Sequence, residues 1–128
     1  MLFRSLADAT DTPDARAEAM LADMAEAMLA DAPETASGLG IDTGARAALK
    51  GRLGDKSPAG QARIAAHVKD RLARLRAVDR DALSAGVRND VDVVLAAHEL
   101  AEQGFAFPFG DMAMMNSNWS YQIGRAHV

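Results

Sequence analysis

The stretch "TPDARAEAMLADMAEAMLADA", residues 12–32, decides the fold. Thr12 is a suitable N-cap and Pro13 fits the first helical position. Apolar residues then recur at the i, i+3, i+4, i+7 spacing of one helical face. This stripe consists of Ala17, Met20, Leu21, Met24, Met28 and Leu29. The pattern predicts an amphipathic helix whose methionines pack into a core; an adaptable binding groove is the alternative interpretation.

Similar start signals occur further along the chain. Pro33 begins a short helical turn that Gly38 and Gly40 interrupt, and a second short helix is expected from about Ala45 to Leu53. Ser57 and Pro58 repeat the N-cap signal. The helix that follows has an apolar stripe of Ile64, Val68, Leu72 and Leu75.

Ser84 is expected to open a fourth main helix that stops near Gly104. One side of this helix carries Val87, Val91, Val94, Leu95 and His98. The segment "FAFPFGDMAMMNSNWSY", residues 105–121, then reads as an aromatic-rich C-terminal loop, partly packed back on the helices through its phenylalanines. No segment alternates with the period of a strand. The sequence predicts an all-α fold with about four main helices in an antiparallel or irregular bundle.

Composition excludes several classes of protein. Alanine supplies 28 of the 128 residues, and alanine favours helices but buries little area. The core should therefore be thin, as in helices that pack against something else. The net charge of −4 argues against a nucleic-acid partner, and the lack of cysteine excludes disulfides and thiolate zinc sites. No apolar run is long enough for a membrane span, and the N-terminus lacks the apolar region of a signal peptide.

Two local patterns have an ordinary interpretation. Residues 38–44 have the spacing G-x-G-x-x-x-G after a helix, which favours a helix C-cap and a turn over a phosphate-binding loop. The helix after Pro58 is locally basic, which we interpret as a solvated face rather than a site for an anionic partner. Its cations are Lys69, Arg71, Arg74 and Arg76.

The segment "HELAE", residues 98–102, resembles the zinc-peptidase motif H-E-x-x-H, in which two histidines at i and i+4 bind one ion. Glu102 stands where the second histidine would be. His67 is the only further histidine candidate outside the C-terminal tail, and His98 lies on the apolar side of its helix. We therefore expect a core or boundary histidine, with no catalytic or metal residue; a small metalloenzyme that uses His98 and Glu102 is the minor alternative.

Several stretches of the sequence, taken in their order along the chain, resemble a known family. "APETASGLGIDTGARAALKGRLGDKSPAGQARIAAHV", "DVDVVLAAHELAEQGFAFPFGD" and "NSNWSYQ" resemble the N-terminal part of the bacterial domain of unknown function 885 family. The likeness runs from about residue 15 to residue 121.

The resemblance implies a longer helical protein of the zincin type, a zinc-dependent peptidase whose H-E-x-x-P-G-H-H-like helix lies far downstream. That motif is absent here, so no cofactor is expected in this chain and zinc only in the parent. A peptide substrate, and an exported, periplasmic, secreted or lipid-anchored location, are likewise implied only for the parent. The partner expected for this chain is the downstream part of its own parent. Asn118, Trp119 and Tyr121 are proposed to line the parent's substrate cleft, since amide donors and amphipathic rings suit such a place.

The two ends of the chain do not fit this pattern. The tail "IGRAHV" can be back-translated to the start of a common short-read sequencing adapter, and "MLFRS" to the end of its reverse complement. We therefore expect residues 1–5 and 122–128 to be adapter read-through. Residues 6–121 are then an incomplete N-terminal helical portion of a larger domain, inactive by itself. The alternative is a small self-contained helical binding module.

Overall fold

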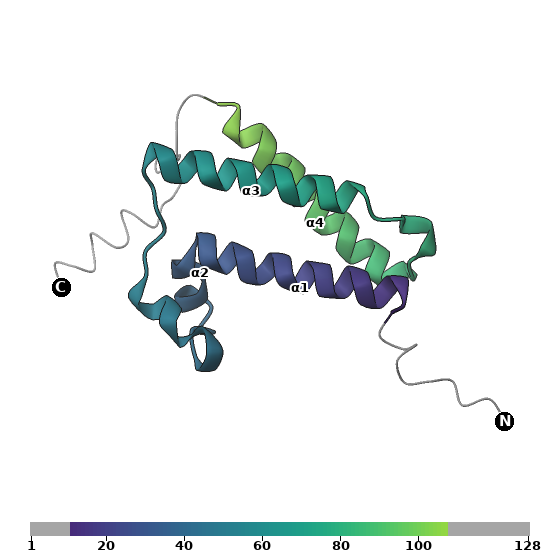
Figure 1. The fold of residues 1–128 in the computed structure, drawn as a ribbon, viewed down its shortest axis with the longest axis horizontal. Helices are drawn as coiled ribbons and strands as arrows, with labels where there is room; N and C mark the ends of the chain where they lie inside the picture. The colour runs from purple at the N-terminus through teal and green to yellow at the C-terminus, as the bar shows by residue number, and fades with distance from the viewer. Residues whose placement is uncertain (1–10, 108–128) are drawn as a thin grey trace.

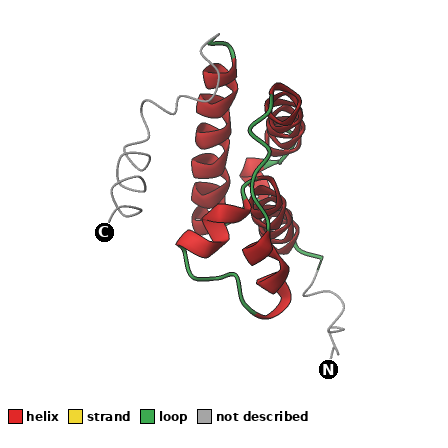
Figure 2. Cartoon of the chain, turned by 90° about the vertical axis from the view of Figure 1, so that its left-hand side faces the viewer, coloured by secondary structure: helices red, strands yellow, loops and turns green. Residues whose placement is uncertain are grey.

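The computed structural model describes residues 11–107, and all of the regular structure in that part of the chain is helical. Figure 1 shows two long helices, α1 and α3, side by side and running in opposite directions. A third long helix, α4, crosses behind both, and Figure 2 shows this second layer with α1 and α3 seen nearly end-on. The elements are α1 (Pro13–Asp31), α2 (Pro33–Gly38), η2 (Gly44–Gly51), α3 (Pro58–Arg76), η3 (Arg80–Ala82) and α4 (Ala85–Phe105). The all-α prediction is confirmed.

The predicted helix starts are confirmed by their capping bonds. The hydroxyl of Thr12 accepts the Ala15 N–H at 3.1 Å, and that of Ser57 accepts the Gly60 N–H at 3.1 Å. Ser84 begins α4 in a different way: its own N–H donates to the Asp14 carboxylate at 2.9 Å. The first turn of α1 therefore fixes the start of α4, although 70 residues separate the two groups in sequence.

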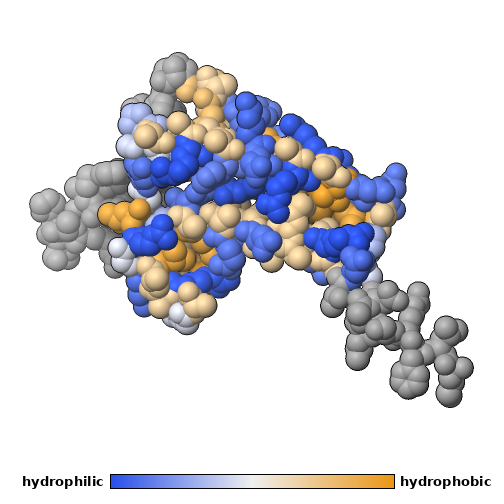
Figure 3. All heavy atoms as spheres, viewed as in Figure 1, coloured by the Kyte–Doolittle hydropathy of each residue, from blue (hydrophilic) through white to orange (hydrophobic). Residues whose placement is uncertain are grey.

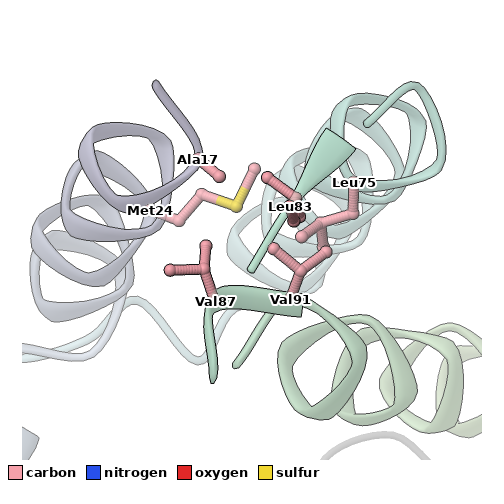
Figure 4. Close-up of a cluster of buried hydrophobic side chains, with 6 residues drawn as sticks. All are labelled: Ala17, Met24, Leu75, Leu83, Val87 and Val91. Atoms are coloured by element: carbon pink, nitrogen blue, oxygen red, sulfur yellow. The ribbon is translucent and has the colours of Figure 1, made fainter. Parts of the chain in front are cut away.

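The core is a small cluster contributed by all three long helices and the turn before α4. Figure 4 shows its buried side chains pointing toward one another. They are Ala17, Met24, Leu75, Leu83, Val87 and Val91. Met20, Leu21, Val78, Val94 and Leu95 pack around them, partly buried. The apolar stripes predicted for α1, α3 and α4 thus meet in one place, and the core interpretation of Met24 is confirmed, whereas Met28 is exposed.

The segment between α2 and α3 differs from the prediction. The expected helix from about Ala45 to Leu53 is instead the 3₁₀ helix η2, which ends at Gly51 and has no buried residue. Gly40 and Gly44 have φ of 70° and 56°, a left-handed backbone that glycine adopts without steric cost. The glycines of this stretch therefore turn the chain, as expected from a helix end followed by a connection.

Surface features complete the fold. In Figure 3, hydrophilic side chains spread over the α1–α3 face, with smaller apolar areas between them. None of the helices described is long and apolar enough to cross a membrane. At the end of α4, Phe105 and Phe107 are exposed, so the prediction that the phenylalanines pack back on the helices is wrong for these two. The rest of the aromatic loop lies outside the described residues.

Candidate functional site

The segment "HELAE" lies on the last turns of α4, where Glu99 and Glu102 reach toward α3 and Leu100 is exposed. His98 is buried, as expected for a core histidine, and its Nδ1–H donates to the Val94 carbonyl at 2.8 Å. The carboxylates of Glu99 and Glu102 both approach the guanidinium of Arg76, at 3.2 and 3.8 Å. The two glutamates of this segment therefore form an ion-pair cluster between α3 and α4.

This arrangement does not fit a zinc ion. A structural or catalytic zinc site needs at least three protein ligands directed at one point. Glu102, the residue in the position of the motif's second histidine, is directed at Arg76 instead. Within residues 11–107, no group of three or more His, Asp or Glu side chains could hold a metal ion.

A different polar cluster joins α1 to α3. Asp31, in the last turn of α1, accepts a hydrogen bond from the His67 Nδ1–H at 2.9 Å. The other carboxylate oxygen accepts from the Arg71 guanidinium at 2.7 Å. His67 and Arg71 are one helical turn apart on α3, so both reach the same carboxylate. We call Asp31, His67 and Arg71 the α1–α3 cluster.

Burial makes this cluster unlike the other ion pairs of the described chain. The side chain of Arg71 is 7% exposed and that of Asp31 is 14% exposed, whereas both partners of the Arg63–Asp55 pair are about half exposed. A carboxylate at a helix C-terminus meets the negative end of the helix dipole. Arg71 offsets that repulsion and also neutralises the buried charge.

The cluster borders a shallow pocket of about 260 Å³ between α1 and α3. Its apolar part comes from α1, and its lining is Met24, Ala27, Ala30, Asp31, His67, Asp70, Arg71 and Arg74. His67 is about half exposed, and its Nδ1–H donates to Asp31. In a neutral ring this bond makes Nε2 the hydrogen-bond acceptor. A carboxylate that fixes an imidazole in this tautomer is a feature of both general bases and metal ligands. Among the described residues, the cluster is not part of any group of three or more side chains that could hold a metal ion.

Sequence reasoning identified His67 only as a spare histidine and missed its partners. Arg71 was expected on a solvated face, and that expectation is wrong because the residue is buried against Asp31. A local signal existed, since His67 and Arg71 have the i, i+4 spacing of residues that act together. Pairing them with Asp31 requires knowing that α1 and α3 run in opposite directions side by side.

Among residues 11–107, four carboxyl groups outside the cluster have a lowered pKa, and in two of them, Asp14 and Glu34, the main cause is a backbone N–H. The N–H of Ser84 holds the pKa of Asp14 below its usual value, and the N–H of Gly54 does the same for Glu34. In both cases the carboxylate accepts a backbone hydrogen bond that only its charged form makes well. Both residues fasten one segment to another: Asp14 joins α1 to α4, and Glu34 joins α2 to the loop before α3.

Three residues are proposed to line a substrate cleft of the parent. Asn118, Trp119 and Tyr121 lie outside the described residues. The α1–α3 cluster and the exposed apolar residues of α4 both lie within residues 11–107.

Comparison with known proteins identifies one family. The family model described as "Bacterial protein of unknown function (DUF885)" matches residues 33–126, which is more than half of the chain. The match covers every described element after α1, and it begins later than the likeness expected from about residue 15. No curated protein and no solved structure matches the chain.

Proposed function

Because this chain belongs to the DUF885 family of bacterial proteins of unknown function, we propose that it is the N-terminal helical portion of a zinc-dependent peptidase. The zinc-binding helix of the parent lies outside this sequence, and the chain supplies a helical scaffold rather than catalytic groups. Its main partner is the downstream part of the same parent. The substrate is a peptide, met only by the whole parent, which is exported or lipid-anchored.

The observation that supports the scaffold role is a second apolar stripe on α4. Val93, Ala97 and Leu100 are spaced i, i+4, i+7, on a different face from the buried Val87 and Val91. Val93 is 61% exposed and Leu100 is 71% exposed. We call these three residues the outer stripe. A helix that is amphipathic for one core needs one stripe, so a second one favours packing against a further part of the protein.

Burial of either large residue of the outer stripe would contribute a measurable free energy of stabilisation. Full burial of a Val or Leu side chain contributes about 1.5–3 kcal/mol. The outer stripe by itself is too small for a stable protein–protein interface. It suits an intramolecular contact, in which the covalent link removes much of the entropic cost of association.

The alternative is a self-contained helical binding module. The observation that favours it is the cluster around Met24, Leu75 and Val91, whose side chains are at most 2% exposed. The two functions predict different behaviour for the isolated chain. A module stays monomeric with the outer stripe exposed, whereas a scaffold portion associates weakly through that stripe.

The assignment of the two tails is part of the same proposal. If residues 1–5 and 122–128 are adapter read-through, their removal leaves the melting temperature of the chain unchanged. The family match extends to residue 126, so it lends no support to this assignment at the C-terminus. Recovery of a longer genomic frame that encodes the same tails would contradict it.

The decisive experiment compares the chain with its full-length genomic parent. We expect the parent to bind zinc stoichiometrically and to cleave peptides, with both properties lost on treatment with a chelator and absent from residues 1–128 alone. A parent without zinc-dependent hydrolysis would refute the proposal. Zinc binding by the chain that His98→Ala abolishes would revive the small-metalloenzyme alternative.

Sedimentation of the isolated chain tests the scaffold role. Leu100→Glu places a charge in the outer stripe and should reduce self-association, whereas the control Met28→Glu changes an exposed apolar residue of α1. A wild-type chain that is monomeric at all concentrations, with no effect of Leu100→Glu, would favour the binding module.

A further inference from the structure

A second apolar hollow lies between α3 and the C-terminal end of α4. Its volume is about 480 Å³, within the range of pockets that bury apolar ligands. The lining residues are Ala65, Ala66, Lys69, Glu102, Phe105 and Ala106. The short side chains of Ala65 and Ala66 leave space between the helices, and the Phe105 ring is partly exposed beside them. We call this hollow the α3–α4 pocket.

The position of this pocket relative to the chain limits what can occupy it. Ala106 lines the pocket, and the sequence continues from there as "FPFGDMAMMNSNWSY", residues 107–121. Phe109 is three residues beyond Ala106, a span of at most about 10 Å. The same segment contains Trp119, Tyr121 and three methionines. The nearest apolar groups in sequence are therefore within reach of the pocket.

We propose that the α3–α4 pocket is the docking site for residues 108–121 of this chain, with Phe109 as the first side chain to enter it. A residue tethered three positions away has an effective concentration in the millimolar range or above, which a separate partner seldom reaches. Burial of one phenylalanine ring is a sufficient driving force. Lys69 is the cation of the pocket lining, and Asp111 follows Phe109 by two residues, so the two can pair when the segment docks. The acidic residue of the lining, Glu102, already faces Arg76.

This docking site is separate from the surface used in the proposed function. The outer stripe and the α3–α4 pocket lie on different faces of α4, because Glu102 and Ala106 fall outside the spacing of Val93, Ala97 and Leu100. The docking therefore holds or fails whether or not the parent is a peptidase.

Disulfide crosslinking tests the proposal cleanly, since the chain has no cysteine of its own. The test pair is Ala66→Cys with Phe109→Cys. The control pair is Arg74→Cys with Phe109→Cys, because Arg74 is on the same helix but lines the pocket on the α1 side. Under mild oxidation at low protein concentration, we expect the intramolecular disulfide to form at least about tenfold faster in the test pair.

The alternative occupants give different products. Disulfide-linked dimers in place of the intramolecular product would show that a second copy fills the pocket. Equal rates in the two pairs, or no crosslink in either, would overturn the proposal. A second readout keeps the test independent of disulfide geometry: Ala66→Glu should red-shift the emission of Trp119, the single tryptophan, while Arg74→Glu should not. Unchanged emission in both variants would also count against docking.

Discussion

Removing the guanidinium of Arg71 should destabilise the protein far more than removing an arginine elsewhere on α3. Arg71→Met keeps the length and most of the aliphatic volume of the side chain, so packing is largely preserved. It leaves the Asp31 carboxylate nearly buried at the C-terminal end of α1 without its 2.7 Å partner. Both the burial and the helix dipole disfavour that charge.

The structure sets the size of the effect. Removing one partner of a buried ion pair typically costs about 3–5 kcal/mol. His67 still donates to Asp31, and the neighbouring pocket is open to water, so we expect about 2–3 kcal/mol. In a domain of this size, each kcal/mol lowers the melting temperature by about 4–8 °C. Arg71→Met should therefore melt about 10–20 °C below the wild type.

The assay is urea unfolding followed by far-UV circular dichroism, for a double-mutant cycle. The variants are Arg71→Met, Asp31→Asn and the double variant, and we expect a coupling energy of about 1–3 kcal/mol. Arg63→Met is the matched control. Arg63 is on the same helix and pairs with Asp55 at 3.2 Å, but both side chains are about half exposed, so its loss should cost less than about 1 kcal/mol.

The reasoning fails on one clear result. If Arg71→Met and Arg63→Met cost the same free energy of unfolding, the burial of the Asp31–Arg71 pair does not matter. A coupling energy close to zero would lead to the same conclusion.

Two further predictions concern a close contact and a pH effect. A Cβ on Gly60 would clash with the Asp55 carbonyl oxygen, so Gly60→Ala should lower the free energy of unfolding by about 1–3 kcal/mol. A Cβ on Gly86 meets open space, so Gly86→Ala should stabilise α4 by about 0.5–1 kcal/mol. Equal melting temperatures of the two variants would contradict this prediction. The Asp14 carboxyl has a pKa below its usual 3.8, so its contribution to stability is present above about pH 4 and is lost as the pH falls through the lowered pKa. Urea unfolding between about pH 5 and about pH 2 should show a smaller loss for Asp14→Asn than for the wild type, and identical pH profiles would show that the bond to the Ser84 N–H contributes nothing.

The features of this fold that depend on short sequence separations were predictable. Thr12 and Ser57 cap their helices because the bonds they make span only three residues. The periodic stripes also identified Val91 and His98 as buried. The expected helix after Gly44 was only partly right, because a 3₁₀ helix and a short α-helix have nearly the same local pattern.

The candidate site was much less predictable. Arg71 looks like any other cation on α3, and its burial depends on Asp31, which is 40 residues earlier. Composition gave the wrong expectation for Phe105 and Phe107, because an aromatic residue indicates a preference for burial but not the presence of a surface that buries it. The family was recognised from several stretches of sequence that follow one another in the family's order. No arrangement of side chains in a site contributed to that recognition.

Because η2 has no buried residue, we expect this segment to unfold locally before the remainder of the described fold. The segment from Gly44 to Gly51 packs against α2. It is also held by the exposed Arg46–Glu26 pair and, just beyond its end, by the hydrogen bond from the Gly54 N–H to Glu34. Exposed ion pairs and single hydrogen bonds of this kind contribute little each. Under native conditions η2 should therefore form a low-stability cooperative unit of its own, exchanging its amide protons well before the three long helices do. The connection between α2 and α3 is accordingly the natural place for a first proteolytic cut, and one where the chain should tolerate an inserted segment without loss of the core.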